Sequence, residues 1–314
     1  MPLTGEQPPL IVLLGPTAIG KTSLALKLAQ ALDGEIIGAD SRQVYLHMDI
    51  GTAKPTSADR DTVPHHLINF LDPADQLTLA RYQEMTYATV DDIHARGKVP
   101  LLVGGTGQYL TAVIEGWSIP GVPPNDALRA ELEAYADLHG KDALYERLQR
   151  IDPDAAVKIH PNNVRRVVRA LEVCIEAGER ISVLQRKKPP PYRILELGLR
   201  YERQLLYDRA DKRVDQMMAR GFLAEVQALL DMGYDRNLPS MSGLGYVQLV
   251  RHLLDQMSLA DAVEDTKIAT HQYIRRQLTW FRGHNPDVVW HNIETLDEQA
   301  IINDCKRWLQ GEQA

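Results

Sequence analysis

The segment from residue 10 to residue 28 constrains the fold more than any other part of this chain. An apolar run of strand length, Leu10–Leu14, leads into a loop bounded by two glycines, and an amphipathic helix follows. Strand, loop and helix together match the pattern G-x-x-x-x-G-K-[ST] in the context that this pattern requires. The predicted phosphate-binding loop consists of Gly15, Pro16, Thr17, Ala18, Ile19, Gly20, Lys21 and Thr22.

The residue types of this loop explain how it would hold phosphate. The two glycines allow successive backbone amides to turn inward, and the helix that begins near Lys21 adds the positive end of its dipole. Lys21 supplies a mobile positive charge, and Thr22 supplies a hydroxyl group suited to Mg²⁺. The alternative is a glycine-rich turn that only links a strand to a helix, and the matching strand and helix argue against it.

Composition limits the classes to which the chain can belong. With 314 residues, 44% of them hydrophobic and 25% charged, it is long enough for one large α/β domain or for a domain with an inserted second unit. No apolar run approaches membrane-spanning length and Met1–Pro9 lacks a signal sequence, so we expect a cytoplasmic protein. Cys174 and Cys305 lack metal-ligand spacing. A net charge of −7 means that any nucleic-acid binding must use local basic patches.

A second predicted strand, Glu35–Ala39, ends at Asp40. Ligands of open α/β sheets bind outside the carboxyl ends of the strands, so Asp40 is expected over the same crevice as the phosphate loop. Asp40 is therefore a candidate catalytic residue. Capping of the following turn by Asp40 or Ser41 explains the same spacing equally well.

A third predicted strand, Val99–Val103, stops at the sequence Gly104-Gly105-Thr106-Gly107. This junction places bare backbone and the Thr106 hydroxyl on the same edge of the sheet. Nucleotide hydrolases with a phosphate loop use an Asp after such a strand to hold Mg²⁺. Gly-Gly-Thr stands in its place here, which weakens a nucleotide-hydrolase interpretation without excluding it.

Two stretches rich in proline, 118–124 and 186–192, divide the chain. The segment between them is mostly helical, with helices predicted over 126–138, 142–150 and 163–177, and Ile194–Leu199 then returns as a strand. We predict an α/β fold in which a P-loop NTPase-like parallel sheet is flanked by helices and carries an inserted helical domain. The expected domains are a first part of the core (1–119), the helical insertion (120–188), and core completion with carboxyl-terminal helices (189–314).

Three helices present arginine at helical spacing. In the insertion, a predicted apolar stripe of Val164, Val168, Leu171 and Ile175 lies beside a face with Arg165, Arg169, Glu172 and Glu176. That face suits RNA contact and internal ion pairing equally well. The helix from about residue 202 carries Arg209, Arg213 and Arg220, one of which can reach the phosphate loop. The last helix opposes Ile274, Leu278 and Phe281 to Arg275, Thr279 and Arg282, with Arg276 and Trp280 alongside, which suits RNA contact or plain helix packing.

Taken together, these motifs resemble one family, the tRNA dimethylallyltransferases, over nearly the whole chain and in the expected order. The string Met48-Asp49-Ile50-Gly51-Thr52-Ala53-Lys54-Pro55 is the most specific part of the resemblance. The remaining motifs are the phosphate loop 15–22, Asp40–Tyr45, Val103–Tyr109, His160–Asn163, Arg169–Glu172, Gly245-Tyr246 and Arg276–Arg282.

The resemblance implies transfer of a dimethylallyl group from its diphosphate to the exocyclic N6 amine of the adenosine 3′-adjacent to the anticodon. The tRNAs are those that read codons starting with U, and the product is N6-(dimethylallyl)adenosine. The family places the prenyl diphosphate in the phosphate loop instead of ATP, which agrees with the missing Asp. Mg²⁺, dimethylallyl diphosphate and the tRNA anticodon stem-loop are the implied cofactor and partners, with no membrane, and we expect a monomer.

Residue roles carry over by motif position. The resemblance implies that loop residues 15–22 hold the diphosphate, that Thr22 contacts the metal, that Asp40 is the general base, and that Thr106 and Arg213 lie at the reaction centre. The implied tRNA contacts are Asp40, Ser41, Arg42, Gln43, Thr106, Arg129, Arg165, Arg166, Arg169, Gly245, Tyr246, Arg275, Arg276 and Arg282.

The chain departs from the family pattern at two places. Ile19 stands where the loop usually has serine, which removes one possible hydroxyl contact to phosphate. Residues 242–247 lack the basic residues that commonly flank Gly-Tyr. Two other classes remain as alternatives: a small-molecule kinase that uses ATP, and a non-catalytic RNA-binding protein in which the loop is a nucleotide switch. Neither explains Gly104-Gly105-Thr106 together with the basic helices.

Overall fold

The computed structural model describes residues 7–284 and 287–312, so residues 1–6 of the amino-terminal segment considered above lie outside it. Two compact units divide the chain. Unit 1 consists of Met1–Ile114 and Pro191–Ala314, and unit 2 consists of Glu115–Pro190. Unit 2 therefore interrupts unit 1 in sequence. Within the described residues, no helix is both long and apolar enough to span a membrane.

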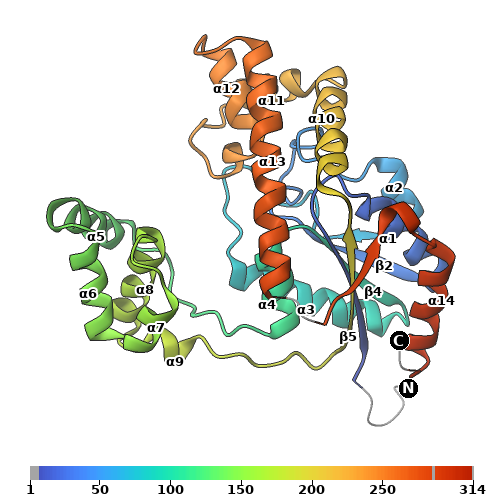
Figure 1. Cartoon of the computed structure of the whole chain (residues 1–314), viewed down its shortest axis with the longest axis horizontal. Helices are drawn as coiled ribbons and strands as arrows, with labels where there is room; N and C mark the ends of the chain where they lie inside the picture. Colours follow the sequence, from blue (N-terminus) through green and yellow to red (C-terminus); the bar gives the residue numbers. More distant parts are fainter. Residues whose placement is uncertain (1–6, 285–286, 313–314) are drawn as a thin grey trace. The chain divides into compact units, whose positions relative to one another are not determined.

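Unit 1 is built on a parallel sheet with the strand order β3-β2-β4-β1-β5-β6 (Figure 1). The strands are β1 (Pro9–Leu14), β2 (Gly34–Ala39), β3 (His65–His66), β4 (Val99–Gly104), β5 (Arg193–Arg200) and β6 (Val289–Asn292).

The central strand β1 pairs in parallel with β4 on one side and β5 on the other, with Ile11 opposite Leu101 and Leu195. Its side chains Leu10–Leu14 are fully buried, because helices cover both faces of a parallel sheet and each face must be apolar. The predicted return of residues 194–199 to the sheet is confirmed, since β5 lies directly beside β1. The expected α/β fold is the observed one.

Helices pack on both faces of the sheet. One apolar cluster contains α1 (Lys21–Leu32) and α14 (Glu298–Leu309), and the other contains α3 (Leu79–Ala95) and α4 (Gly107–Glu115). The long helix α13 (Leu259–His284) contributes to both clusters, with Ile274 in the first and Phe281 in the second. It therefore passes over the edge where the strands end.

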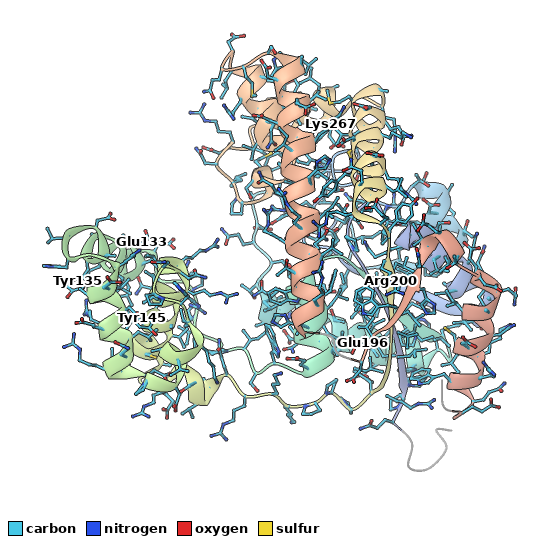
Figure 2. All side chains as sticks on the ribbon, viewed as in Figure 1. Glu133, Tyr135, Tyr145, Glu196, Arg200 and Lys267 are labelled. Atoms are coloured by element: carbon cyan, nitrogen blue, oxygen red, sulfur yellow. The ribbon has the colours of Figure 1, made fainter. Side chains whose placement is uncertain are left out.

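The remaining helices of unit 1 form a third cluster around α13. They are α10 (Arg203–Ala219), α11 (Phe222–Asp231) and α12 (Tyr246–Leu253), and the loop segment 44–50 packs against α11 and α12. Lys267 of α13, labelled in Figure 2, forms an ion pair of 2.7 Å with Asp215 of α10. The short elements of unit 1 are α2 (Ser57–Thr62), η1 (Ser240–Ser242) and η2 (Ile293–Thr295).

Unit 2 is entirely helical within its described elements. It contains α5 (Asp126–His139), α6 (Lys141–Ile151), α7 (Pro153–Lys158), α8 (Val164–Ala177) and α9 (Ile181–Leu184). Asn125, Asp152 and Asn163 cap α5, α7 and α8 by accepting hydrogen bonds from first-turn amides, as expected for these residue types. Tyr145, labelled in Figure 2, donates its hydroxyl to the Ala156 carbonyl at 2.7 Å and so ties α6 to α7.

The buried face of α8 differs from the predicted stripe. Ile175 is 45% exposed, whereas Glu172, predicted on the solvated face, is fully buried. The core of unit 2 takes Val167, Val168 and Leu171 from α8, so the buried face is rotated from the predicted stripe. Glu172 tolerates burial because hydrogen-bond donors surround its carboxylate.

Candidate active site

The phosphate-binding loop lies between β1 and α1. Gly20 has φ 107° and ψ 15°, a left-handed conformation that favours glycine, and α1 begins at the next residue. The Lys21 ammonium donates to the carbonyls of Gly15 at 2.9 Å and Pro16 at 2.8 Å. Among the described residues this leaves one ammonium proton for a ligand. The lysine is thus held over its own loop before any phosphate arrives.

Burial determines the charge state of this lysine. It lowers the pKa of Lys21 to about 7, an effect that the Asp40 carboxylate opposes and the Arg213 guanidinium reinforces. An anion bound in the loop would restore the charge, because an opposite charge close by favours the protonated ammonium.

Ile19 of the phosphate loop is shielded from solvent. It is 1% exposed and belongs to the same apolar cluster as Leu24 and Leu28 of α1. A Cβ built on Gly15 would lie 3.3 Å from its Cγ2 atom and 3.0 Å from the Leu199 carbonyl oxygen. Ile19 therefore fills the space beneath the loop.

The ends of β2 and β4 are tied together beside the loop. The Thr106 amide donates to the Ala39 carbonyl at 3.1 Å, and the Ser41 amide donates to the Thr106 hydroxyl at 3.0 Å. The Arg42 amide donates to Asp40 Oδ1 at 2.9 Å. Asp40 thus makes the turn contact expected of a capping residue. Its side chain also lines two adjoining cavities, as expected of a candidate catalytic residue. The two interpretations of Asp40 are compatible.

Packing, more than ligand approach, explains the glycines around Thr106. A Cβ on Gly104 would lie 2.0 Å from the Ala39 carbonyl oxygen, one on Gly105 would lie 2.5 Å from Gln277 Nε2, and one on Gly107 would lie 2.3 Å from Trp280 Cδ1. Neighbouring strand and helix α13 therefore require glycine at these positions. Thr106 provides the side chain of this turn.

A cavity of about 560 Å³ lies between the phosphate loop and α10. Besides the loop, it is lined by Asp40, by residues 52–55 and by basic side chains of α10. The basic side chains that line it are Lys21, Lys54, Arg209, Lys212, Arg213 and Arg220. Burial lowers the pKa of Arg213, and Asp40 partly offsets that effect. We call this space the cationic cavity.

A second cavity of about 260 Å³ adjoins the first. Both cavities are lined by Thr17, Ala18, Asp40, Thr52, Arg213 and Met217. The second cavity is also lined by three aromatic side chains, Phe222, Tyr246 and Tyr273, together with polar, small and aliphatic residues and the side chains of Arg42 and Arg276. We call it the aromatic cavity. Burial, assisted by the Asp40 charge, raises the pKa of Tyr273 to about 12 and keeps its hydroxyl neutral.

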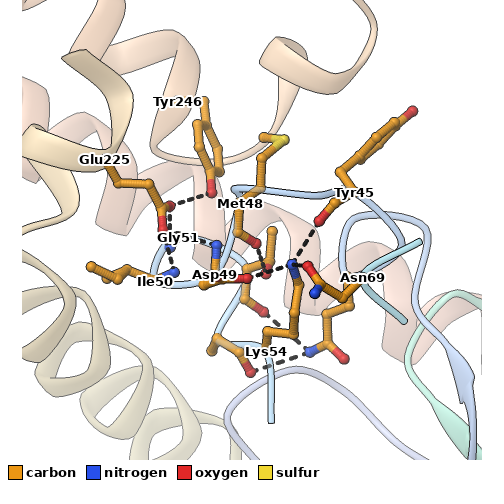
Figure 3. A network of polar contacts seen from close by, with 12 residues as sticks. Tyr45, Met48, Asp49, Ile50, Gly51, Lys54, Asn69, Glu225 and Tyr246 are labelled. Carbon is orange, nitrogen blue, oxygen red and sulfur yellow. Dashed lines mark hydrogen bonds and ion pairs between the residues drawn. The ribbon is translucent and has the colours of Figure 1, made fainter. Parts of the chain in front are cut away.

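The signature loop 48–55 forms part of the wall of both cavities, and polar contacts hold it in place (Figure 3). Lys54 donates to the Tyr45 carbonyl at 2.6 Å, to Asp49 Oδ1 at 2.5 Å and to Asn69 Oδ1 at 2.8 Å. All three of its protons are used, and burial lowers its pKa against the opposing effect of Asp49. Lys54 therefore shapes the wall and has no proton left to donate to phosphate.

Glu225 of α11 anchors the other end of this loop (Figure 3). Its Oε2 accepts from the amides of Asp49 at 2.8 Å and Ile50 at 2.6 Å, and its Oε1 accepts from the Gly51 amide at 3.0 Å and the Tyr246 hydroxyl at 2.6 Å. Sequence reasoning missed Glu225. The signal that could have indicated a close contact here is Gly51.

Several residues expected to contact tRNA are engaged within unit 1. The Arg42 guanidinium donates to the Pro239 carbonyl at 2.5 Å and to Ser242 Oγ at 3.1 Å. Gln43 Nε2 donates to the Thr52 carbonyl at 3.1 Å. Tyr246 is 1% exposed and donates its hydroxyl to Glu225, and its side chain lines the aromatic cavity.

The carboxyl-terminal third of α13 carries exposed arginines. Arg275, Arg276 and Arg282 are exposed, as predicted from their spacing. The buried face differs from the prediction, since Gln277 is buried and Leu278 only partly so. Trp280 donates its indole N–H to Thr111 Oγ1 of α4 at 3.0 Å, so the helix packing expected as one alternative for this residue is present.

The arginines of unit 2 fall into two groups. Arg129 and Arg169 contact the buried Glu172 at 2.9 and 2.6 Å, and the Asn125 amide donates to the same carboxylate at 2.7 Å. These contacts lower the pKa of Glu172 against the effect of its burial. Arg165 and Arg166, in the first turn of α8, are exposed and have no ion pair among the described residues.

Unit 1 is therefore an α/β unit in which a phosphate-binding-loop motif lines a cationic cavity, and a second cavity adjoins the first. Family models match the chain under two descriptions, "IPP transferase" over residues 43–284 and "Isopentenyl transferase" over residues 8–70. The chain belongs to the IPP transferase family.

Relatives and solved structures agree with this assignment. The chain is 54% identical to a protein of Roseiflexus castenholzii, over 87% of this chain and 90% of that one, and 46% identical to one of Dehalococcoides mccartyi, over 96% and 93%. Both are named tRNA dimethylallyltransferase. A tRNA isopentenylpyrophosphate transferase of Bacillus halodurans matches with a TM-score of 0.71 at 40% identity, over 96% of each chain. A eukaryotic dimethylallyltransferase described as acting on tRNA matches with a TM-score of 0.84 at 28% identity, over 98% of this chain and 80% of that one.

Proposed function

We propose that this chain transfers a dimethylallyl group from dimethylallyl diphosphate to the N6 amine of the adenosine 3′-adjacent to the anticodon of tRNA. Relatives named for this reaction, at 46 to 54% identity over most of the chain, support the proposal. The observation that carries it is the meeting of a cationic and an aromatic cavity at Asp40 and Arg213. Two substrates that exchange a group must meet at such a junction.

The cationic cavity takes the diphosphate of the donor in this proposal. When the allylic carbon–oxygen bond breaks, negative charge builds on the departing diphosphate, and stabilising that charge lowers the barrier. The phosphate loop, with Lys21, and the Arg213 side chain line the cavity in which that charge would develop. The leaving group is therefore stabilised by groups that are in place before the reaction.

The acceptor amine is activated at the junction. An adenine N6 amine is a poor nucleophile because its lone pair is delocalised into the ring, so close positioning against the allylic carbon supplies much of the acceleration. Asp40 accepts the proton of this amine as the new carbon–nitrogen bond forms. Thr106 holds the turn that presents Asp40, because its hydroxyl fixes the Ser41 amide.

Mg²⁺ fits the loop through the diphosphate. Among the described residues, no group of three His, Cys, Asp or Glu side chains could hold a metal ion. Mg²⁺ often binds through one or two protein oxygens together with substrate phosphates. Thr22, exposed in the first turn of α1, would supply such an oxygen. When bound, the ion would neutralise part of the diphosphate charge.

The exposed arginines would bind the anticodon stem-loop. Arg275, Arg276 and Arg282 on α13 and Arg165 and Arg166 on α8 are free to contact phosphates. An enzyme that modifies a base in a stacked loop must draw that base out of the stack, and the aromatic cavity gives an extruded adenine a place beside Asp40. Ser41, Arg42, Gln43 and Gly245 would shape this entrance, since Arg42 and Gln43 already hold neighbouring loops.

A transfer assay tests the proposal. The chain is incubated with radiolabelled dimethylallyl diphosphate, Mg²⁺ and unmodified tRNA, and the digested nucleosides are separated. We expect label in N6-(dimethylallyl)adenosine at one position of the anticodon loop. Consumption of ATP without prenyl transfer would support a kinase instead, and tight tRNA binding without product at saturating donor would support a non-catalytic RNA-binding protein.

A further inference from the structure

One buried side chain joins the two glycine-containing loops that border the cavities. Gln277 of α13 is 5% exposed. Its Oε1 accepts a hydrogen bond of 2.9 Å from the Thr17 amide, and its Nε2 donates one of 2.7 Å to the Gly105 carbonyl. The phosphate loop and the turn after β4 are therefore linked through a single amide group.

The two contacts require the chemistry of a neutral amide. One partner is a backbone N–H and the other a backbone carbonyl, so the side chain must accept at one end and donate at the other. A carboxylate would place a lone pair against the Gly105 oxygen, and an apolar side chain would leave both backbone groups without their partner. A Cβ on Gly105 would lie 2.5 Å from Gln277 Nε2, so glycine at 105 lets the amide approach.

The linked loops present the side chains that border both cavities. Thr17, whose amide Gln277 holds, lines the cationic and the aromatic cavity. Gly105 precedes Thr106, whose hydroxyl fixes the Ser41 amide next to Asp40. Lys21 is also close, since the same built Cβ on Gly105 would lie 3.5 Å from its Nζ. A shift of Gln277 would therefore move the phosphate loop relative to the turn that presents Asp40.

We propose that Gln277 is a positioning residue that fixes the phosphate loop against the Gly105-Thr106 turn, so that donor and acceptor are aligned for transfer. This inference rests on the proposed function for the identity of the two substrates. Direct contact with tRNA does not explain Gln277, because the side chain is buried and both ends of its amide are occupied by backbone. Its neighbours Arg275 and Arg276 lie on the exposed side of the same helix.

Gln277→Leu tests the link, with Gln272→Leu as the matched control because Gln272 is exposed on the same helix. We expect Gln277→Leu to lower kcat about 10-fold to 100-fold, the scale of a small misplacement of reacting groups. We also expect weaker binding of inorganic pyrophosphate and an unchanged KM for tRNA. Gln272→Leu should match the wild type in all three. Wild-type kcat and pyrophosphate binding in Gln277→Leu, or equal losses in both variants, would overturn the inference.

Gln277→Glu gives a readout that a merely structural role would not move. The protonated carboxyl has the shape and the hydrogen-bonding pattern of the amide, whereas the ionised form repels the Gly105 carbonyl. The activity of Gln277→Glu, divided by that of the wild type at each pH, should therefore rise as the pH falls from about 8.5 to about 6. A flat ratio together with a lowered unfolding temperature would overturn the inference. Failure of the wild type to transfer any prenyl group would instead refute the proposed function.

Discussion

The Ser41 amide and the Thr106 hydroxyl lie 3.0 Å apart, 65 residues apart in the sequence, and their hydrogen bond joins the ends of β2 and β4. The Thr106 amide also donates to the Ala39 carbonyl, so one residue holds the backbone on both sides of Asp40. The direction of the Asp40 side chain therefore depends on Thr106.

Replacing Thr106 tests this relationship. Thr106→Val keeps the shape of the side chain but removes the hydroxyl acceptor, and the Ser41 amide loses its partner at a partly buried site. We expect kcat to fall by about 10-fold or more, the effect of a misplaced base. Thr106→Ser, which retains the hydroxyl, should keep most of the activity. Equal kcat values for the two variants in a steady-state transfer assay would show that the hydroxyl is not needed.

Removal of the proposed base should separate chemistry from binding. Asp40→Asn preserves an oxygen for the Arg42 amide, so the local turn should remain. A positioned general base contributes about 10²-fold to 10⁴-fold, and we expect kcat to fall by that factor. The dissociation constant for tRNA, measured by filter binding, should stay within about twofold. Near-normal transfer by Asp40→Asn would remove the base assignment.

The lowered pKa of Lys21 predicts how donor binding depends on pH. The free protein loses the Lys21 proton near pH 7, whereas bound diphosphate favours the charged form. The complex therefore binds more protons than the free protein above pH 7, and donor affinity should fall there by up to about tenfold per pH unit. Calorimetric titration with the donor, repeated from about pH 6 to about pH 9, measures this pH dependence of donor affinity.

Lys21→Arg is the control for that titration, because its guanidinium stays charged. The phosphate groups of the donor titrate in the same way with both proteins. Its affinity should be lower but should lack the additional decline. A wild-type affinity that follows the Lys21→Arg curve at every pH would contradict the assigned role. The same pKa has a consequence for stability. The unfolded chain binds more protons than the folded one between pH 7 and 10.5, the ordinary pKa of lysine, so this lysine makes the free energy of unfolding rise with pH there.

Replacing Gly51 should destabilise the protein, although the backbone conformation at this position does not require glycine. An alanine Cβ would lie 2.1 Å from Phe222 Cε2 and 2.7 Å from Tyr246 Cε2, both in a packed cluster. We expect Gly51→Ala to lower the free energy of unfolding by about 1 to 3 kcal/mol, the cost of overpacking. Urea denaturation provides the measurement.

Gly283→Ala is the matched control for Gly51→Ala. Among the described residues, nothing lies within 4 Å of its built Cβ, and the residue lies in the last turn of α13. Alanine favours helix over glycine by about 1 kcal/mol, so this variant should be as stable as the wild type or more so. A Gly51→Ala protein as stable as Gly283→Ala would mean that the loop moves away from Phe222 without cost.

The arginines of unit 2 should differ in their effects on tRNA binding. Arg165 and Arg166 are exposed and unpaired among the described residues, so each replacement by alanine should weaken binding and reduce the slope of log affinity against log salt by about one. Arg169 contacts the buried Glu172, and Arg169→Ala should lower the unfolding temperature of unit 2. Filter binding at several KCl concentrations measures the slope of log affinity against log salt for each variant. An unchanged slope in both Arg165→Ala and Arg166→Ala would exclude phosphate contact by these two arginines.

The local elements could be predicted from sequence because their signals are local. The strand, loop and helix of residues 10–28 and the return of β5 to the sheet follow from apolar runs, glycines and helical spacing. The place of Asp40 at a strand end follows from the general rule for open α/β sheets. These features needed no knowledge of distant contacts.

The contacts that complete the site could not be predicted in this way. Gln277 meets Thr17 across 260 residues, and Glu225 meets Asp49 across 176, so neither pairing leaves a periodic pattern in the sequence. The burial of Glu172 was missed for a related reason. A helical wheel assigns a carboxylate to the solvated face, and the guanidinium groups and the Asn125 amide that satisfy it come from tertiary structure.

The central claim is that the phosphate loop grips a diphosphate attached to an allylic carbon and does not grip the terminal phosphates of ATP. Competition binding tests it most directly, with the whole chain, Mg²⁺ and labelled dimethylallyl diphosphate displaced by inorganic pyrophosphate or by ATP. We predict saturable donor binding that pyrophosphate displaces, that ATP displaces only weakly, and that Lys21→Ala impairs. Tight ATP binding with no measurable binding of dimethylallyl diphosphate would contradict the account.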